Sequence, residues 1–332
     1  GDDRITHLAG LDRRIEANLV GLELVPRVSL PLLEEAVAAD EPSLAGAAAL
    51  ALLRIGGARA HAALQGVLEG GAPGARSGVR SALLWGPTAG MLQALRSAAG
   101  SPDPWLAATA CEALAAHGDS TPPRALPDWL AHPEPAVRLA GCHAAAWLAS
   151  SSEALQAVAR QDGAPEVRAA AFEAGIWQRA PWVLVLGRER LGSASADTGA
   201  DGMRERVLFA ALAEPADAAA FTTLAAATAL GPARWEAIAA YGSLNAIEAS
   251  LSGLAASDAP EAEGAGRAFV RMTDCELGAA KRVRAAIPAG SGPDAEEFAD
   301  EAFVPDPEVA KRKWELCRDE FRDGRRWNRG RD

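Results

Sequence analysis

The sequence predicts an all-α protein, built as a solenoid of stacked helix pairs. Five prolines, Pro42, Pro73, Pro104, Pro135 and Pro165, recur at intervals of 31, 31, 31 and 30 residues. Each is followed by a run of apolar residues with helical spacing. Alanine makes up 79 of the 332 residues, and alanine favours helices because it loses no side-chain entropy there.

The composition also excludes several classes of protein. Strands favour β-branched and aromatic residues, so an alanine-rich chain with 5% aromatic residues is a poor candidate for a β-sandwich or β-barrel. A hydrophobic fraction of 49% excludes disorder along the whole chain. No run approaches the roughly 20 apolar residues that a membrane-spanning helix requires, so we expect no membrane partner.

Each predicted repeat begins with a proline, because the first helical turn does not need the missing backbone N–H. The helix dipole favours acidic residues at this end. Such residues stand beside three of the prolines: Asp40, Asp103 and Glu134. Glycines stand where the first helices should end: Gly56, Gly86 and Gly118. A second, shorter helix is expected over residues 61–69, 88–99, 124–131 and 152–160.

One helix pair of about 31 residues cannot bury its own apolar face, but stacked copies can. Capping helices are therefore expected over residues 1–40, and repeats with the 31-residue period over 41–186. Gly, Ser, Ala and Asp interrupt the pattern over 187–203, which predicts a flexible loop. Further helix pairs are expected over 204–273, and a C-terminal cap with an acidic loop and a basic tail over 274–332.

Two repeats carry a motif in which a valine and an arginine follow the proline. They read Pro135-Ala-Val137-Arg138 and Pro165-Glu-Val167-Arg168. This motif resembles the short HEAT-like repeat that also occurs in bilin lyases. The resemblance implies that the valine enters the core and that the arginine bonds to neighbouring turns. It implies a HEAT-like solenoid and indicates almost nothing about activity.

The order of the segments resembles a narrower family of proteobacterial HEAT-like repeat proteins. The chain has LDRRIEANLVGL near its start, then alanine-rich repeats, then AGRAFVRMTDCEL and FVPDPEVAKRKWELCRDEFRDGRRW. Members of this family are associated with type VI secretion, and some resemble immunity proteins. The resemblance implies a chain that binds and neutralises a secreted toxin in the cytoplasm. No family motif marks functional residues, so none is carried over.

The net charge of −11 argues against a nucleic-acid binder and favours a basic protein partner. A nuclease toxin with a basic cleft would be such a partner. One candidate contact is an acidic run, which could also be a solvated loop or the surface on which the basic tail packs. It consists of Asp294, Glu296, Glu297, Asp300 and Glu301. Other candidates lie on second helices, the expected concave face: Gln93, Arg96, Gln156 and Arg160.

The sequence shows no clear catalytic or cofactor motif. Cys111 and Cys142 hold the same repeat position and could meet beside His143, but that position faces the core, so we expect packing and no metal. Four cysteines without a C-x-x-C pair are too few for a disulfide framework and indicate a reducing compartment. The nine tryptophans stand at helical positions, where we expect packing in the core or between repeats.

We therefore expect a protein-binding chain that is not an enzyme and has no cofactor. Two alternatives remain open. The chain could be a structural adaptor of the secretion apparatus. It could also be a HEAT-repeat enzyme of the lyase or DNA-glycosylase type, in which tryptophan, an acid and basic residues would hold a base on the concave face.

Overall fold

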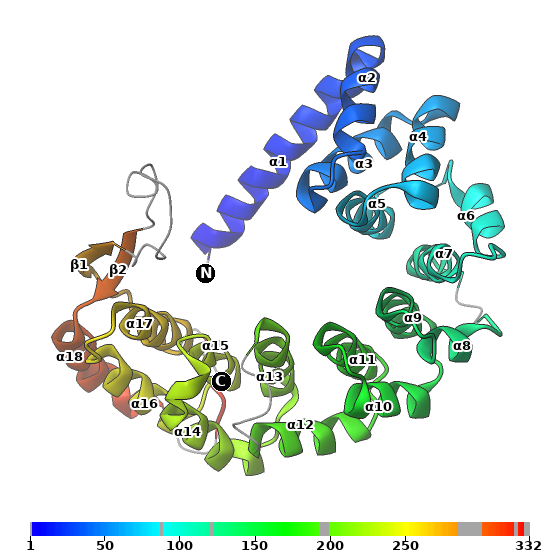
Figure 1. The fold of residues 1–332 in the computed structure, drawn as a ribbon. Coiled ribbons are helices and arrows are strands. Elements are labelled where there is room, and N and C mark those ends of the chain that lie inside the picture. The colour runs from blue at the N-terminus through cyan, green and yellow to red at the C-terminus, as the bar shows by residue number, and fades with distance from the viewer. Residues whose placement is uncertain are drawn as a thin grey trace. The chain divides into compact units, whose positions relative to one another are not determined.

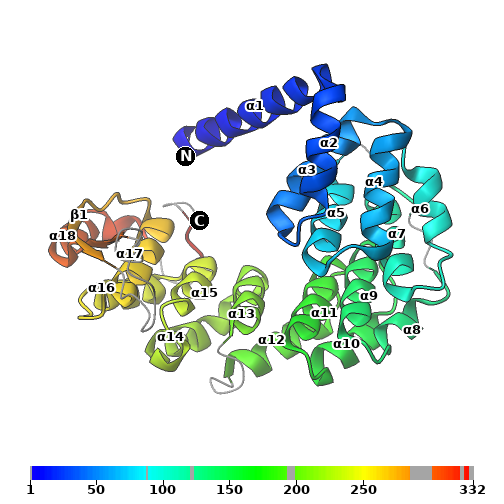
Figure 2. The ribbon, with the colours of Figure 1, turned by 45° about the horizontal axis from the view of Figure 1, so that its top comes forward.

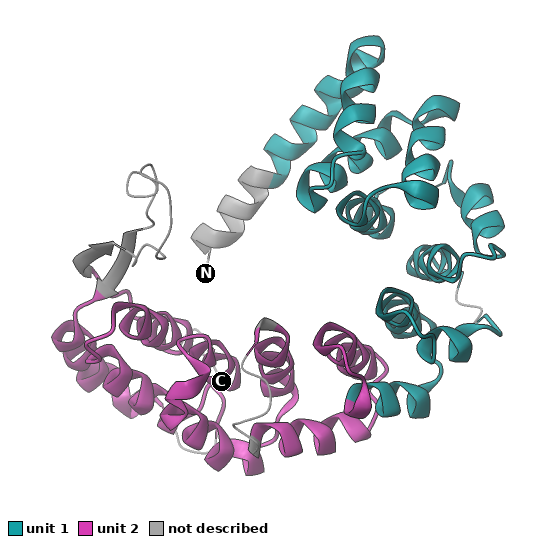
Figure 3. Ribbon diagram, viewed as in Figure 1, with its two compact units in different colours: residues 1–159 teal, residues 160–332 magenta. Residues whose placement is uncertain are grey.

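In a computed structural model, the chain forms two compact units, unit 1 over residues 1–159 and unit 2 over residues 160–332 (Figure 3). The described residues are 2–86, 89–119, 123–192, 199–284, 301–321 and 325–328. Their side chains are described from residue 12 onward, except at Gly192, at Ala200 and over 279–304. Each unit is an α-solenoid in which helix pairs follow one another, which confirms the predicted fold class.

Unit 1 contains two layers of helices (Figures 1 and 2). Every repeated proline in this unit is the first residue of a first-layer helix, as predicted. The first layer consists of α3 (Pro42–Ile55), α5 (Pro73–Trp85), α7 (Pro104–Ala116) and α9 (Pro135–Leu148). The second layer consists of α4 (Gly57–Gly70), α6 (Leu92–Ala98), α8 (Leu126–Leu130) and α10 (Ser152–Gln161), whose last two residues belong to unit 2. These layers are preceded by α1 (Asp2–Leu24) and α2 (Pro26–Val37).

Unit 2 continues the pattern with shorter and less regular helices. One layer consists of α11 (Pro165–Trp177), α13 (Ala200–Leu212), α15 (Arg234–Tyr241) and α17 (Ala259–Thr273). The other consists of α12 (Trp182–Gly192), α14 (Ala218–Ala226), α16 (Leu244–Leu254) and α18 (Pro307–Cys317). Short 3-10 turns lie at Pro215–Asp217, Thr228–Leu230 and Arg318–Glu320. None of the helices in the described ranges has the length and apolar character needed to cross a bilayer.

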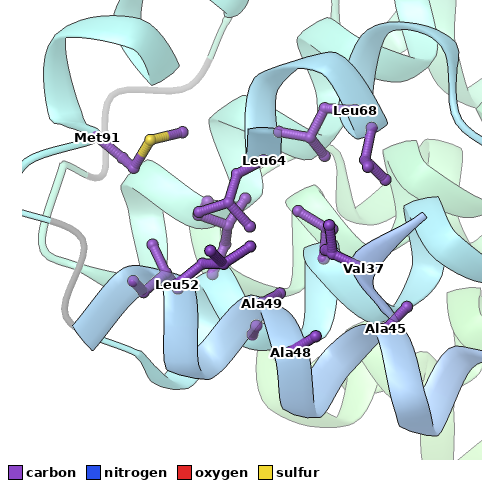
Figure 4. Close-up of a cluster of buried hydrophobic side chains, with 14 of the residues drawn as sticks. Val37, Ala45, Ala48, Ala49, Leu52, Leu64, Leu68 and Met91 are labelled. Carbon is purple, nitrogen blue, oxygen red and sulfur yellow. The ribbon is translucent and has the colours of Figure 1, made fainter. Parts of the chain in front are cut away.

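Small residues allow the first-layer helices to pack at backbone contact. Gly46 of α3 faces Gly78 of α5 so closely that a Cβ atom built on Gly78 would lie 2.6 Å from the Gly46 nitrogen and 2.6 Å from the Pro42 carbonyl oxygen. Around this contact, alanines of α3 and leucines of α3 and α4 fill the core of unit 1 (Figure 4). The alanine-rich composition is therefore a packing feature as well as a helix-forming one.

Hydrogen bonds fix the turns between successive helices. Asp103 caps α7 by accepting a bond from the Trp105 N–H at 2.9 Å, as its position predicts. Asp40, in contrast, accepts a bond from the Gly74 N–H at 2.7 Å, at the start of the helix that opens the next repeat. At the start of α3 the capping side chain is Glu41.

The valine and arginine of the repeat motif behave as the HEAT-like resemblance implies. Val137 and Val167 are 1% and 0% exposed. Arg138 donates hydrogen bonds to the carbonyl oxygens of His132 and Pro133, both at 2.8 Å. Arg168 donates to the Asp162 carbonyl oxygen at 2.9 Å. Each arginine therefore ties its helix to the turn that precedes it.

One small β-ribbon departs from the all-α prediction. Strand β1 (Ala279–Arg284) pairs antiparallel with β2 (Glu301–Pro305), and β2 lies against α17. The strands were not predicted because β1 has a single β-branched residue, Val283, and lacks the alternation of apolar and polar residues that marks a half-buried strand. The acidic run falls mainly between these strands, outside the described residues.

The predicted flexible loop over 187–203 is too long. Helix α12 continues to Gly192, and α13 already begins at Ala200. Ion pairs stabilise these helix ends: Arg188 pairs with Asp217 at 2.7 Å, and Arg190 pairs with Glu205. Composition alone could not predict where these helices end and begin, because the carboxylates that pair with both arginines lie in later helices and turns.

One arginine attaches the C-terminal tail to the helices of unit 2. Helix α18 ends at Cys317, and a 3-10 turn at Arg318–Glu320 follows it. All three guanidinium nitrogens of Arg326 donate hydrogen bonds to carbonyl oxygens at the ends of α13 and α15. The acceptors are Ala210, Ala211, Ala213, Ala240 and Tyr241, at 2.6–3.1 Å. The next residue, Trp327, is buried and donates its backbone N–H to the Gly242 carbonyl oxygen.

The contacts of Arg326 predict a large effect of removing its side chain. Carbonyls at the C-terminal ends of helices lack intrahelical partners and carry partial negative charge. We expect Arg326→Ala to lower the free energy of unfolding by about 2–3 kcal/mol in urea titrations. The matched control is Arg267→Ala, which removes an arginine that is 69% exposed and paired with Glu263 four residues away, and should cost about 0.5 kcal/mol or less. Equal effects of the two substitutions would contradict the capping role.

Candidate partner-binding surface

Three tryptophans are exposed at one repeat position. Trp85, Trp147 and Trp177 each stand twelve residues after the proline of their repeat, in the last turn of the helix that begins at this proline. Their exposed fractions are 81%, 44% and 70%. A tryptophan side chain carries a large apolar surface, and such exposure recurring at equivalent positions is typical of an interaction surface.

The prediction that all tryptophans pack inside the protein is wrong at these positions. Seven residues earlier, on the same helix face, lie the buried small residues Gly78, Ala140 and Ala170. Helical periodicity alone therefore places the tryptophans in the core. The tryptophans are exposed instead because they occupy the last turn of each helix, where neighbouring helices do not cover them. The shared distance from the proline was the signal that could have identified them.

In unit 1 the ends of α3, α5 and α7 lie beside one another. A Cβ atom on Gly86, at the end of α5, would lie 2.7 Å from the side chain of Leu53 near the end of α3. At the end of α7, Nε2 of His117 lies 2.8 Å from the Leu83 carbonyl oxygen of α5. Helix α9 packs along α7. We call Trp85, the exposed His117 and Trp147 the aromatic edge of unit 1. Trp177 holds the equivalent repeat position in unit 2.

A partly buried ion pair connects two of the helices that form this edge. Arg80 of α5 donates two hydrogen bonds, both 2.6 Å long, to the carboxylate of Glu112 in α7. Glu112 is 1% exposed, and its burial raises the pKa of its carboxyl group, although the bonds from Arg80 act in the opposite direction. Because the buried carboxylate depends on the half-buried guanidinium for compensation of its charge, this pair favours one alignment of α5 and α7.

Unit 2 has a cavity of about 250 Å³ lined by charged side chains. Its lining includes four arginines and two carboxylates, so it is basic in a chain that is acidic overall. The charged residues are Arg160, Asp162, Arg168, Arg190, Glu205 and Arg206. Arg190 pairs with Glu205 and lies over the Phe172 ring, with 5.6 Å from its guanidinium carbon to the ring centre. Guanidinium groups bind carboxylates and phosphates, so the cavity suits an anionic group.

The residues predicted as contacts are distributed over several elements. Gln93 and Arg96 are exposed on α6, and Arg96 lies 3.9 Å from the carboxylate of Asp119. Gln156 is half-buried on α10. Arg160 belongs to unit 2, where it lines the cavity and pairs with Glu189 at 2.6 Å. That hydrogen bond raises the pKa of Arg160 and lowers the pKa of Glu189.

The predicted acidic run lies outside the described residues. Asp294, Glu296, Glu297 and Asp300 fall within residues 285–300, and Glu301 begins β2 with an undescribed side chain. Its role as a contact therefore stays a prediction.

The cysteines of unit 1 lie in the core, as their repeat position predicts. Cys111 and Cys142 are 9% and 0% exposed, and burial raises the pKa of the Cys111 thiol to about 11. In the described part of the chain, no three His, Cys, Asp or Glu side chains are grouped so that they could hold a metal ion.

The repeat geometry agrees with a known family over part of the chain. Residues 89–174 match HEAT repeats. This segment extends from the turn before α6 into α11 and includes both Val-Arg motifs. Among curated proteins, none matches the chain. HEAT repeats commonly mediate contacts between proteins and typically form non-catalytic scaffolds, so the chain is a HEAT-like solenoid suited to protein binding.

Proposed function

We propose that this chain is a non-catalytic solenoid whose aromatic edge binds a protein partner. We propose further that it is an immunity protein of the cytoplasm, whose partner is a type VI secretion toxin, a basic nuclease. The observation that supports the binding function is the exposure of tryptophan at one repeat position. The proposal that the partner is a toxin rests on the family resemblance of the chain ends and on the net charge of −11.

The aromatic edge has the properties of a binding hot spot. Tryptophan is enriched among the residues that contribute most to the affinity of protein interfaces. Trp85 and Trp147 stand in the last turn of packed helices, so little backbone entropy is lost when a partner covers them. His117 lies between the two repeats with its ring hydrogen-bonded to Leu83, which fixes its orientation. A partner can therefore bury preformed apolar surface over three consecutive repeats.

Charge supplies the second part of the proposal. An acidic chain attracts a basic partner over long distances, which raises the association rate and discriminates against acidic proteins. A nuclease carries positive charge in the cleft that binds nucleic acid. An immunity protein that covers such a cleft neutralises the toxin without any chemical step.

Substitution of the aromatic edge tests the binding surface. The proposal predicts a toxin gene beside the gene for this chain. We expect the double variant Trp85→Ser/Trp147→Ser to bind the nuclease domain of that toxin about 100-fold more weakly, because two interface tryptophans are lost. Cells that express this domain should survive with the unchanged protein and die with the variant. The matched control, Leu316→Ser, removes another exposed apolar side chain (86% exposed, in α18) and should keep both binding and protection.

The other outcomes separate the proposals. Circular dichroism and urea unfolding should show that the double variant folds normally, since Trp85 is 81% exposed and Trp147 is 44% exposed. Full protection by a folded double variant would place the interface elsewhere. No protection by the unchanged protein would exclude the toxin, and a deletion strain that stops secreting without becoming toxin-sensitive would favour a structural adaptor.

Charge reversal of the acidic run tests the electrostatic part. We expect the variant with lysine at Glu296, Glu297, Asp300 and Glu301 to associate with the nuclease domain more than tenfold more slowly at low salt, because steering depends on charge. The difference should shrink as salt is added, which stopped-flow measurements can follow. Unchanged association rates at all salt concentrations would show that this run is only solvated surface.

A further inference from the structure

Two free cysteines of unit 2 lie side by side although 42 residues separate them along the chain. The Sγ atoms of Cys275 and Cys317 are 3.8 Å apart, and both residues are half-buried. Cys275 follows the end of α17, and Cys317 is the last residue of α18. The segment between them contains both strands of the β-ribbon and the acidic run.

The surrounding contacts hold the two cysteines in place. Asp274 ends α17 in a left-handed conformation with φ 61°, and the Cys275 N–H donates to the Thr273 hydroxyl oxygen at 3.2 Å. On the other side, the ring of Trp314 in α18 packs edge-on against Phe269 of α17, with 6.4 Å between ring centres. Lys313 also donates a hydrogen bond to the carbonyl oxygen of Glu276, the residue after Cys275. The pairing of the sulfurs thus follows from the way α18 packs on α17.

We infer that Cys275 and Cys317 form a thiol-oxidation site, which a small-molecule disulfide such as glutathione disulfide converts into a reversible bond between α17 and α18. A disulfide requires about 2.05 Å between the sulfurs, so rotation of the side chains has to close the remaining distance. The bond would add a covalent link to the contacts that hold α18. It would also close the segment that carries the acidic run into a loop.

The reaction proceeds by two exchanges. One cysteine thiolate attacks a sulfur of glutathione disulfide, which forms a mixed disulfide and releases one glutathione thiolate. The second cysteine then attacks the protein-side sulfur and releases the other glutathione. Two cysteine thiols are oxidised, two glutathione molecules are formed, and the two thiol protons end on glutathione or water. Burial, as the main cause, and the neighbouring Cys275, as the second, raise the pKa of Cys317 to about 11. Its thiolate is therefore scarce at neutral pH, and the reaction should accelerate in alkali.

Thiol counting and peptide mapping test this site on the full chain. After incubation with glutathione disulfide, removal of the reagent and denaturation, we expect the number of titratable thiols to fall from four to two. A tryptic map without reductant should contain Cys275 and Cys317 in one linked peptide, which dithiothreitol separates. Cys111 and Cys142, which are buried in unit 1, serve as internal controls and should remain free thiols.

Single-cysteine variants distinguish this pair from general reactivity. Cys275→Ser and Cys317→Ser should each lose the linked peptide and stop at a mixed disulfide with glutathione on the remaining cysteine. Four titratable thiols after oxidation, glutathione on both cysteines without a link, or a linked peptide from any other pair would overturn the inference.

Discussion

Close approach of the first-layer helices is the constraint on which unit 1 depends. The backbones of α3 and α5 meet at Gly46 and Gly78, where even one methyl group would displace main-chain atoms. Alanine occupies most of the neighbouring core positions of α3. Because such residues lose little side-chain entropy on burial, an alanine-rich chain can stack helices tightly without large aromatic residues in this part of the core. Larger side chains are then left for other positions.

The same packing explains where the exposed tryptophans lie. Small residues in the middle of α3 and α5 let these helices pack at backbone contact, and the end of α7 lies beside α5. Trp85 and Trp147 occupy the last turn, beyond the zone in which neighbours cover each other. Unit 2 is stabilised differently, by the stacked rings of Phe209, Phe221 and Tyr241 and by the guanidinium of Arg326 over the helix ends. The surface proposed for the partner is therefore a consequence of the repeat.

Local patterns predicted the helices well and tertiary contacts poorly. The proline spacing correctly placed the start of each helix from α3 to α11 in the first layer, because proline at the first helical position is a local effect. The Val-Arg motif correctly implied a buried valine and an arginine bound to the preceding turn. In contrast, the extent of α12, the β-ribbon and the position of Arg326 depend on residues far away in the sequence. The exposed tryptophans share a distance from the proline that the sequence already contains, whereas the Cys275–Cys317 pair required knowledge of which helix ends meet.

The most direct test of close helix approach is a comparison of two glycine-to-alanine substitutions. Gly78→Ala places a methyl group against the backbone of α3 and should lower the free energy of unfolding by about 1–3 kcal/mol. Gly66→Ala, in an exposed turn of α4 with no atom within 4 Å of the added carbon, should raise it by about 0.5–1 kcal/mol, because alanine is the better helix former. Urea unfolding measures both. Effects of opposite sign are expected, and a stabilising Gly78→Ala would contradict backbone contact between α3 and α5.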